Sequence, residues 1–264
     1  MYSVTTNAAA RYLASARLDR VRLESLGSEL APGDELSAYV VQDALHERLT
    51  EAGAGAVSGH KIGCTTPIMQ SYLGIDTPCA GGVFEPTERR QRGVYSFDKL
   101  LHPGVECELA VRLGADLIPD DAPYDAVSVS DAVEAVTPAI EIVDDRWVDY
   151  KAIDTPSLIA DDFFGAGCVL GDDAQNWQEL DLSEIEGSMT INGELVGTGK
   201  GSAILDQPLS ALAWLANLMA QRGKSLKAGE FVLLGSLVET KWVERGDLVE
   251  IDLGSLGRAT AHFV

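Results

Sequence analysis

The chain has 264 residues, 46% of them hydrophobic, and a formal net charge of −21 from 41 acidic and 20 basic side chains. This length and apolar content are typical of a globular protein with one substantial core. The negative charge disfavours nucleic acid and anionic membrane surfaces as partners, because both repel an acidic surface. The apolar runs also fall short of the roughly 20 residues that a helix needs to cross a bilayer.

The N-terminal stretch MYSVTTNAAARYLASARLDR has no apolar segment behind a basic start, so we expect no secretory signal and a cytoplasmic location. Four cysteines, at positions 64, 79, 107 and 168, show neither CxxC spacing nor the spacing of zinc ligands. They are therefore predicted to be reduced thiols rather than zinc ligands or disulfide partners.

Helices are predicted first, in AARYLASARL and in DELSAYVVQDALHERLTEAG, where residues 32–34 mark the entry and Gly53 and Gly55 the end. From Val57 the pattern changes to short strands interrupted by glycine. We expect a strand in VSGHKIG, a short helix from about Thr66 to Gly74, and a strand in GGVFE.

The strand GVECELAVRL comes next, followed by a predicted helix at about residues 130–136 and a strand from Thr137 to Trp147. The last third is predicted to hold a hairpin turning at Asn192-Gly193, an amphipathic helix in DQPLSALAWLANLMAQRG capped by Asp206, and three further strands. No repeat or linker interrupts the chain. These elements predict one α+β domain over residues 1–264, with a helical part at 1–56 and a β part at 57–264.

Two glutamates, Glu106 and Glu108, are separated by one residue in the apolar strand GVECELAVRL. Because side chains alternate along a strand, both carboxylates lie on one face, which is either exposed to solvent or part of a metal site. Glu141 stands alone in the apolar run PAIEIV, where a buried carboxylate would need a partner of opposite charge. Three such carboxylates would form a hard oxygen site for Mg²⁺ or Mn²⁺.

Lys61 lies in the apolar stretch GHKIGC and is predicted either to reach the surface or to face the carboxylates as an acid, a base or an anion-binding group. His60 lies on the opposite face of that strand and receives no role. Arg146, in DDRW, is expected either to bind a substrate carboxylate or to pair with a neighbouring aspartate. The glycine-rich stretch GTGKGSA lacks the spacing of a phosphate loop and is predicted to be a flexible loop.

The motifs GHKIGCTTPIMQSYLGIDTP, VECELAV, PAIEIVDDRW, ADDFFGAGCVLG and QPLSALAWLANLMAQRGKSLKAGEFVLLGSL occur in this order. Together they resemble the 2-keto-4-pentenoate hydratase and 4-oxalocrotonate decarboxylase family, within the fumarylacetoacetate hydrolase superfamily. The resemblance runs from about Gly59 to the C-terminus. It implies a mixed β-roll, a homo-oligomer, and small 2-oxo or 2-hydroxydienoic acids from aromatic catabolism as substrates.

The resemblance also implies site residues. Glu106, Glu108 and Glu141 match the glutamates that hold Mg²⁺ or Mn²⁺, and Lys61 matches an active-site lysine. Such enzymes hydrate 2-hydroxypenta-2,4-dienoate to a 4-hydroxy-2-oxo acid, or remove CO₂ from 4-oxalocrotonate. The residues that we expect to touch the substrate are Arg146, Asp162, Phe163, Ser236 and Leu237.

The chain departs from the hydratase pattern at Cys79, because hydratases usually carry an aspartate at this position. A thiol with an ordinary pKa of about 8.5 replaces a carboxylate poorly at neutral pH, so decarboxylation gains weight against hydration. Phe163 and Phe164 also stand where the family commonly has small residues, which predicts an unusual substrate pocket. Two further alternatives are an acylpyruvate C–C hydrolase, which usually needs a histidine dyad, and a binding protein without activity.

Overall fold

The computed structural model describes residues 2–66, 70–71 and 75–264. Its α-helices are α1 (Val4–Asp19), α2 (Glu35–Leu49), α4 (Ala126–Ser130), α5 (Thr155–Ala160) and α6 (Pro208–Gln221). The strands are β1 (Val57–Gly63), β2 (Cys79–Phe84), β3 (Glu88–Arg90), β4 (Arg92–Tyr95), β5 (Pro103–Leu113), β6 (Val133–Asp144), β7 (Gly165–Leu170), β8 (Glu186–Ile191), β9 (Glu194–Lys200), β10 (Phe231–Trp242), β11 (Leu248–Asp252) and β12 (Arg258–Phe263). The predicted α+β class is confirmed.

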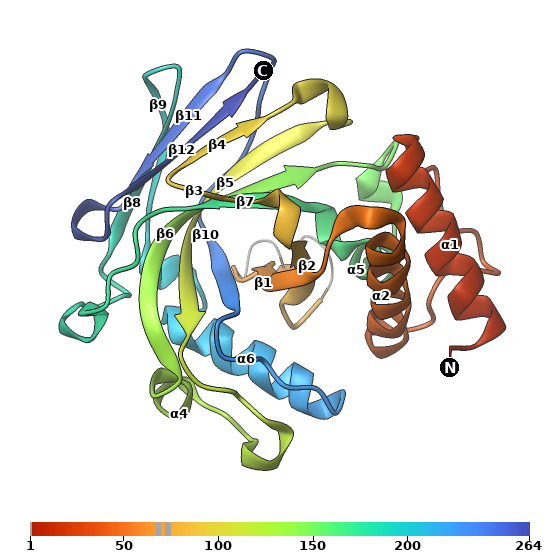
Figure 1. Cartoon of the computed structure of the whole chain (residues 1–264), viewed down its shortest axis with the longest axis horizontal. Helices are drawn as coiled ribbons and strands as arrows, with labels where there is room; N and C mark the ends of the chain where they lie inside the picture. Colours follow the sequence, from red (N-terminus) through yellow and green to blue (C-terminus); the bar gives the residue numbers. More distant parts are fainter. Residues whose placement is uncertain (1, 67–69, 72–74) are drawn as a thin grey trace.

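Two sheets form the β part of the molecule (Figure 1). The first sheet has the strand order β2-β1-β10-β5-β6-β7-β3, and the second has the order β4-β12-β11-β8-β9. The first sheet is mixed, because β1 pairs with β10 and β3 with β7 in parallel, whereas its other neighbouring strands are antiparallel. It curls until β2 comes close to β7, two strands that are far apart in its hydrogen-bonding order.

The two faces of the first sheet have different surroundings. Cys107 and Leu109 of β5 face the main core, together with the second sheet and α6. The opposite face, inside the curl, carries Glu106 and Glu108 and a small apolar cluster that includes Ala110 and Leu233. The alternation predicted for β5 therefore separates a large hydrophobic core from a small polar interior.

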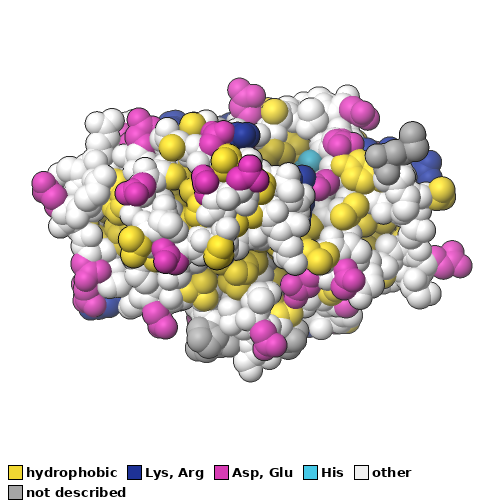
Figure 2. Space-filling model, turned by 90° about the horizontal axis from the view of Figure 1, so that it is seen from below, with side chains coloured by type: hydrophobic (Ala, Val, Ile, Leu, Met, Phe, Trp, Pro, Cys, Tyr) yellow, Lys and Arg dark blue, Asp and Glu magenta, His cyan; other side chains and the backbone are white. Residues whose placement is uncertain are grey.

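The two N-terminal helices pack against each other on one side of the sheet, and α2 also contacts α5 (Figure 1). Asp34 caps α2 and forms a capping box with Ser37, which fixes the helix start predicted at residues 32–34. Among the described residues, no helix is long and apolar enough to cross a membrane. Carboxylates are spread across the face drawn in Figure 2 and outnumber the basic side chains there.

Several predicted boundaries are wrong. The helix expected at 130–136 is α4, which ends at Ser130, and β6 begins at Val133 because its first residues pair with the end of β5. Gln207, and not Asp206, caps α6, since its side chain accepts the N–H of Leu209. The helix predicted from Thr66 to Gly74 falls largely outside the described residues.

The hairpin between β8 and β9 turns at Asn192 and Gly193, as predicted, with positive φ at both. Most of the stretch GTGKGSA is not a loop, because β9 continues through Lys200, and Gly201–Ala203 form a single 3-10 turn. Its glycines are needed for close packing: a Cβ on Gly199 would lie 1.9 Å from the carbonyl oxygen of Leu237 in β10. This contact joins β9 of the second sheet to the first.

Replacing Gly199 by alanine is therefore expected to destabilise the protein by about 1–3 kcal/mol, because the backbone of β10 must move to make room for a methyl group. Urea unfolding followed by circular dichroism measures the loss. Gly33→Ala is the matched control, since no atom lies within 4 Å of its Cβ position. Equal stability of the two variants would contradict the packing argument.

Candidate metal and proton-transfer site

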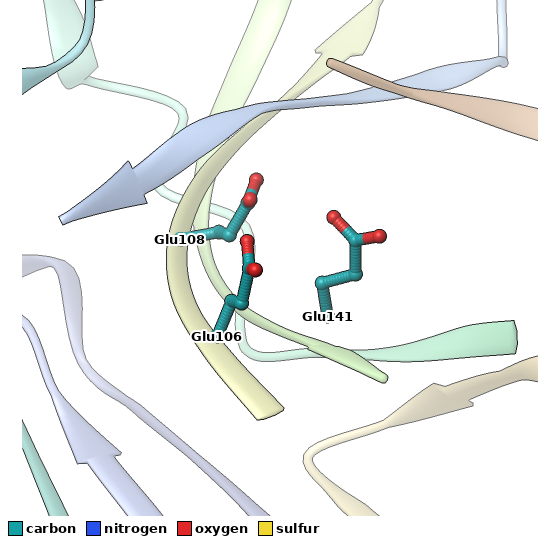
Figure 3. Close-up of side chains that lie close together, drawn as sticks. All are labelled: Glu106, Glu108 and Glu141. Atoms are coloured by element: carbon teal, nitrogen blue, oxygen red, sulfur yellow. The ribbon is translucent and has the colours of Figure 1, made fainter. Parts of the chain in front are cut away.

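Glu106, Glu108 and Glu141 meet inside the curl of the first sheet (Figure 3). One carboxylate oxygen of each lies within 4.8 Å of the others. Glu106 on β5 stands directly opposite Glu141 on β6, and Glu108 follows two residues along on the same face. Glu108 and Glu141 are buried and Glu106 is half-buried. Like charges in directly opposite positions destabilise a sheet, so this arrangement requires compensation by positive charge.

Lys61 supplies part of that compensation. Its Nζ lies 3.1 Å from Oε1 of Glu141, and its side chain is only 3% exposed. The lysine comes from β1, which is separated from β6 in the sheet by β10 and β5. Three strand spacings would put the two strands roughly 14 Å apart in a flat sheet. The curl of the sheet therefore brings Lys61 to the glutamates. Of the two alternatives for this lysine, it faces the carboxylates and does not reach the surface.

The remaining carboxylate oxygens are incompletely satisfied by the chain. Thr240 donates a short hydrogen bond to Glu106, and the N–H of Gly235 donates to Oε2 of Glu108 at 3.0 Å. Among the described residues, Oε1 of Glu108 and Oε2 of Glu141 are buried without a hydrogen-bond donor, and Oε1 of Glu141 has only its ion pair with Lys61. Buried oxygens that lack donors, in a cluster of three carboxylates, fit a hard divalent cation.

The electrostatics of the cluster follow from burial and mutual repulsion. Burial, Glu141 and Glu106 raise the pKa of Glu108 well above its ordinary value. Burial raises the pKa of Glu141 to about 7, with a further contribution from Glu106, even though the charge of Lys61 opposes the shift. For Lys61, burial alone would lower the pKa, but Glu141, Glu106 and Glu108 together raise it. In the metal-free chain, Lys61 is therefore an ammonium group.

Cys79 on β2 lies directly opposite Gly63 on β1, and directly opposite residues share one face of a sheet. Lys61 is two residues before Gly63, so it lies on that face too. The Cys79 side chain is fully buried. A hydrogen bond with Cys64, followed by burial, raises the pKa of Cys79 well above its ordinary value. The thiol is neutral at physiological pH and cannot act as a carboxylate does.

Of the residues predicted to touch substrate, Phe163 and Ser236 lie near the cluster. The Phe163 ring centroid is 5.5 Å from Nζ of Lys61. Ser236 is paired with Glu108 across β10 and β5, and its hydroxyl donates to the carbonyl of Val238 at 2.6 Å, with the carbonyl of Cys107 at 3.2 Å as the alternative acceptor. Both positions are compatible with the predicted contacts.

The other three predicted substrate residues point elsewhere. Leu237 packs in the main core, near Gly187 of β8 and on the same side as Cys107. Arg146 donates to Oδ2 and to the backbone carbonyl of Asp161. It therefore pairs with an aspartate, as one alternative predicted, but this aspartate is 15 residues along the chain and not a sequence neighbour. Asp162 accepts from Arg17, His46 and the N–H of Gly82, so its carboxylate is already occupied.

Sequence reasoning missed four side chains: Thr240 at the cluster, Thr65 buried beside Gly235, and Arg17 and His46 on the helices. Nothing in the spacing of these residues links them to the glutamates. A cavity of about 620 Å³ also lies between the ends of α1 and α2 and strands β2, β4 and β7, but neither Lys61 nor the glutamates line it. Ligand chemistry, rather than cavity size, therefore identifies the site.

Removing one carboxylate should weaken metal binding by at least 100-fold. We expect Glu108→Gln to remain folded, because the amide keeps the shape and accepts the N–H of Gly235, while its binding of Mg²⁺ falls below detection by calorimetry. Glu239→Gln, on an exposed side chain of β10, is the control. Unchanged Mg²⁺ affinity in Glu108→Gln would refute the assignment of this cluster to a metal.

The metal-free protein should lose stability as the pH rises from 5 to 8. A carboxyl with a raised pKa holds its proton more tightly in the folded chain, so its stabilising contribution is complete below about pH 4.5 and is lost as the pH passes about 7.

Thermal melting in EDTA at pH 5 and pH 8 measures this loss, and Mg²⁺ should restore the melting temperature at pH 8. Glu141→Gln is expected to show a flatter pH dependence in EDTA. A wild-type melting temperature that stays constant or rises between the two pH values would show that these carboxyls do not control stability.

Comparison with known proteins places the chain in a family. Residues 85–264 match the family model "Fumarylacetoacetate (FAA) hydrolase C-terminal". The chain is 34% identical to 2-keto-4-pentenoate hydratase 1 of Dechloromonas aromatica, over 98% of this chain and 97% of the relative. It is 31% identical to 4-oxalocrotonate decarboxylase of Pseudomonas putida, over 97% and 96% of the two chains.

The fold is also similar to that of a solved structure, 4-oxalocrotonate decarboxylase from Pseudomonas putida G7 complexed with magnesium and adipate. The TM-score is 0.92 at 29% identity, over 100% of this chain and 99% of the other. The predicted β-roll of the fumarylacetoacetate hydrolase type is thereby confirmed. By its family match and its similarity to these relatives over nearly the whole chain, the protein belongs to the fumarylacetoacetate hydrolase family.

Proposed function

We propose that the protein is a divalent-metal-dependent lyase that hydrates 2-hydroxypenta-2,4-dienoate or a related acid to a 4-hydroxy-2-oxo acid in aromatic catabolism. The observation that carries this proposal is the cluster of three carboxylates with donorless buried oxygens beside a buried lysine. The similarity to a 2-keto-4-pentenoate hydratase over nearly the whole chain supports it.

Glu106, Glu108 and Glu141 would hold Mg²⁺ or Mn²⁺. A similar solved structure contains magnesium, and carboxylate oxygens suit either ion. When bound, the cation would supply a Lewis acid that stabilises negative charge on the oxygens of a 2-oxo acid. It would also supply local positive charge for an anionic substrate, which the net charge of −21 otherwise disfavours.

Lys61 is proposed to move a proton between the oxygen and a carbon of the dienol. As an ammonium beside three carboxylates, it can donate a proton, and it becomes a base more easily once their negative charge is compensated. The ring of Phe163 and the apolar interior of the roll limit the access of water to its Nζ. Water then adds at the far carbon of the conjugated system.

Decarboxylation of a 4-oxalocrotonate-type acid is the second candidate, because Cys79 favours it. A buried neutral thiol cannot replace the aspartate that the family resemblance assigns to water addition. Loss of CO₂ needs the same stabilised enolate but no added water. The similarity to 4-oxalocrotonate decarboxylases of Pseudomonas putida supports this candidate equally.

An acylpyruvate hydrolase or a binding protein without activity has less support. His46 pairs with Asp162, His60 with Glu230, and His102 with Asp145, so these histidines are engaged away from Lys61 and the three glutamates. The complete carboxylate cluster argues against a protein that has lost catalysis. We further propose that the protein works in the cytoplasm as one domain over residues 1–264, as the order of its elements predicts, and as a homo-oligomer, as the family resemblance implies.

Proton NMR of the purified protein with 2-hydroxypenta-2,4-dienoate and, separately, with 4-oxalocrotonate tests the function. We expect 4-hydroxy-2-oxopentanoate from the first substrate with Mg²⁺ and none in EDTA. Loss of CO₂ from oxalocrotonate without water addition would assign the decarboxylase instead. Silence on both substrates would contradict the proposed lyase.

Two variants separate the roles in the same assay. Lys61→Ala should keep its Mg²⁺ affinity but lose exchange of substrate carbon-bound hydrogen with deuterium. Cys79→Asp should raise the hydration rate, whereas Cys79→Ser, which fits the same space without a carboxylate, should not. Retained exchange in Lys61→Ala would remove the lysine from the mechanism.

A further inference from the structure

The turn Asp162–Phe164 between α5 and β7 has an unfavourable backbone. Its three consecutive residues have φ values of 57°, 46° and 69°, and none of them is glycine. Non-glycine residues rarely adopt this left-handed region, and a run of three persists only where surrounding contacts hold it. The structure must therefore contain a clamp for this turn.

Polar side chains from both N-terminal helices form that clamp. Arg17, in the last turn of α1, donates from Nε to Asp161 at 2.8 Å and from Nη1 to Asp162 at 2.9 Å. Nε2 of His46, in the last turn of α2, lies 2.6 Å from Oδ1 of Asp162. The two aspartates are completely buried, so neither can exchange these partners for water.

The sheet holds the other side of the turn. Arg146, two residues after the end of β6, pairs with Asp161, and the N–H of Gly82 on β2 donates to Asp162. Only glycine fits at position 81, because a Cβ there would lie 2.7 Å from the carbonyl oxygen of Asp162. The turn is thus fixed between the helices and the edge strand β2.

The held turn places Phe163 against the proposed proton-transfer residue. Phe163 is 5% exposed, and its ring centroid lies 5.5 Å from Nζ of Lys61. A Cβ on Gly63 would lie 3.4 Å from that Nζ and 3.5 Å from the Phe163 ring, so little space separates the two side chains. A small change in the turn would therefore uncover the amine.

We infer that Arg17 and His46 are positioning residues for Lys61: acting through Asp161 and Asp162, they hold the left-handed turn that keeps Phe163 over the amine. The inference rests on the proposed role of Lys61 in proton transfer. It gives the N-terminal helices, which carry no residue of the carboxylate cluster, a part in the reaction.

The first test compares Arg17→Lys and His46→Gln with wild type. Lysine keeps the charge of Arg17 but lacks the planar guanidinium group that binds both aspartates. Glutamine at position 46 keeps a hydrogen-bond donor but places it at a different distance from Asp162. We expect kcat to fall about 10-fold or more, since a misplacement of 1 Å can cost 100-fold, while KM changes little and Mg²⁺ affinity stays the same.

The matched control is Arg222→Lys. Arg222 is about as buried as Arg17 and pairs with the partly exposed Asp43, on the same helix as His46, and none of its hydrogen bonds involves the turn. Its kcat should equal that of wild type. A loss of kcat in Arg222→Lys as large as in Arg17→Lys would show that the helices matter only for stability, and would overturn the inference.

A double-mutant cycle tests the route through Phe163. Phe163→Leu should lower kcat, and adding Arg17→Lys or His46→Gln to it should cause no further loss. Independent, multiplicative losses in the double variants would show that Arg17 and His46 do not act through Phe163. If Arg17→Lys does not fold, the cycle with His46→Gln decides.

A last measurement is independent of turnover. Acetylation of Lys61 by N-hydroxysuccinimidyl acetate, followed by peptide mass spectrometry, should be several-fold faster in Arg17→Lys and His46→Gln than in wild type or Arg222→Lys. Faster labelling of Arg17→Lys and His46→Gln, together with no turnover of either substrate by the wild type, would keep the positioning role and reject the proposed function. Equal labelling in all four proteins would reject the positioning role, whatever the activity.

Discussion

Repulsion between three carboxylates inside the curled sheet is the constraint around which this protein is built. Glu106 faces Glu141 directly across two strands, and Glu108 lies beside them on the same face. With Lys61 the formal charge of the group is −3 + 1 = −2, which one divalent cation would neutralise. Donors from Thr240 and Gly235 reduce the repulsion but leave buried oxygens without partners. Such a cluster costs stability, and this cost is typical of sites selected for chemistry.

The helical segment and the curled sheet are joined by a second group of buried charges. Arg17, in α1, and Arg146, which follows β6, both pair with Asp161, and His46 completes the environment of Asp162. Burial by itself would raise the pKa of Asp162, but the charges of His46 and Arg17, with hydrogen bonds from His46 and Gly82, hold it well below its usual range. The carboxylate is therefore ionised at any physiological pH, and the network holds the strained turn continuously.

Much of the fold and part of the site could be predicted from local patterns. Alternation along β5 is a property of any strand, so it placed Glu106 and Glu108 on one face without knowledge of the partners of β5. The hairpin at Asn192-Gly193 and the capping of α2 by Asp34 also depend on neighbouring residues alone. Prediction failed where distant contacts decide: β6 begins early because it pairs with β5, and GTGKGSA extends as a strand because its glycines pack against β10.

The sequence by itself determined the residue types for a hard-metal site, the face that two of the three glutamates share, and the family resemblance. Only the tertiary structure decided which side chains meet. The curl of the sheet brings Lys61 from β1 to Glu141 on β6, a contact that strand spacing alone would forbid. The tertiary structure also packs Leu237 in the core, and it engages Arg146 and Asp162 in the ion pairs that hold the turn at residues 162–164. These outcomes depend on how elements far apart in the chain pack, and no local pattern encodes that packing.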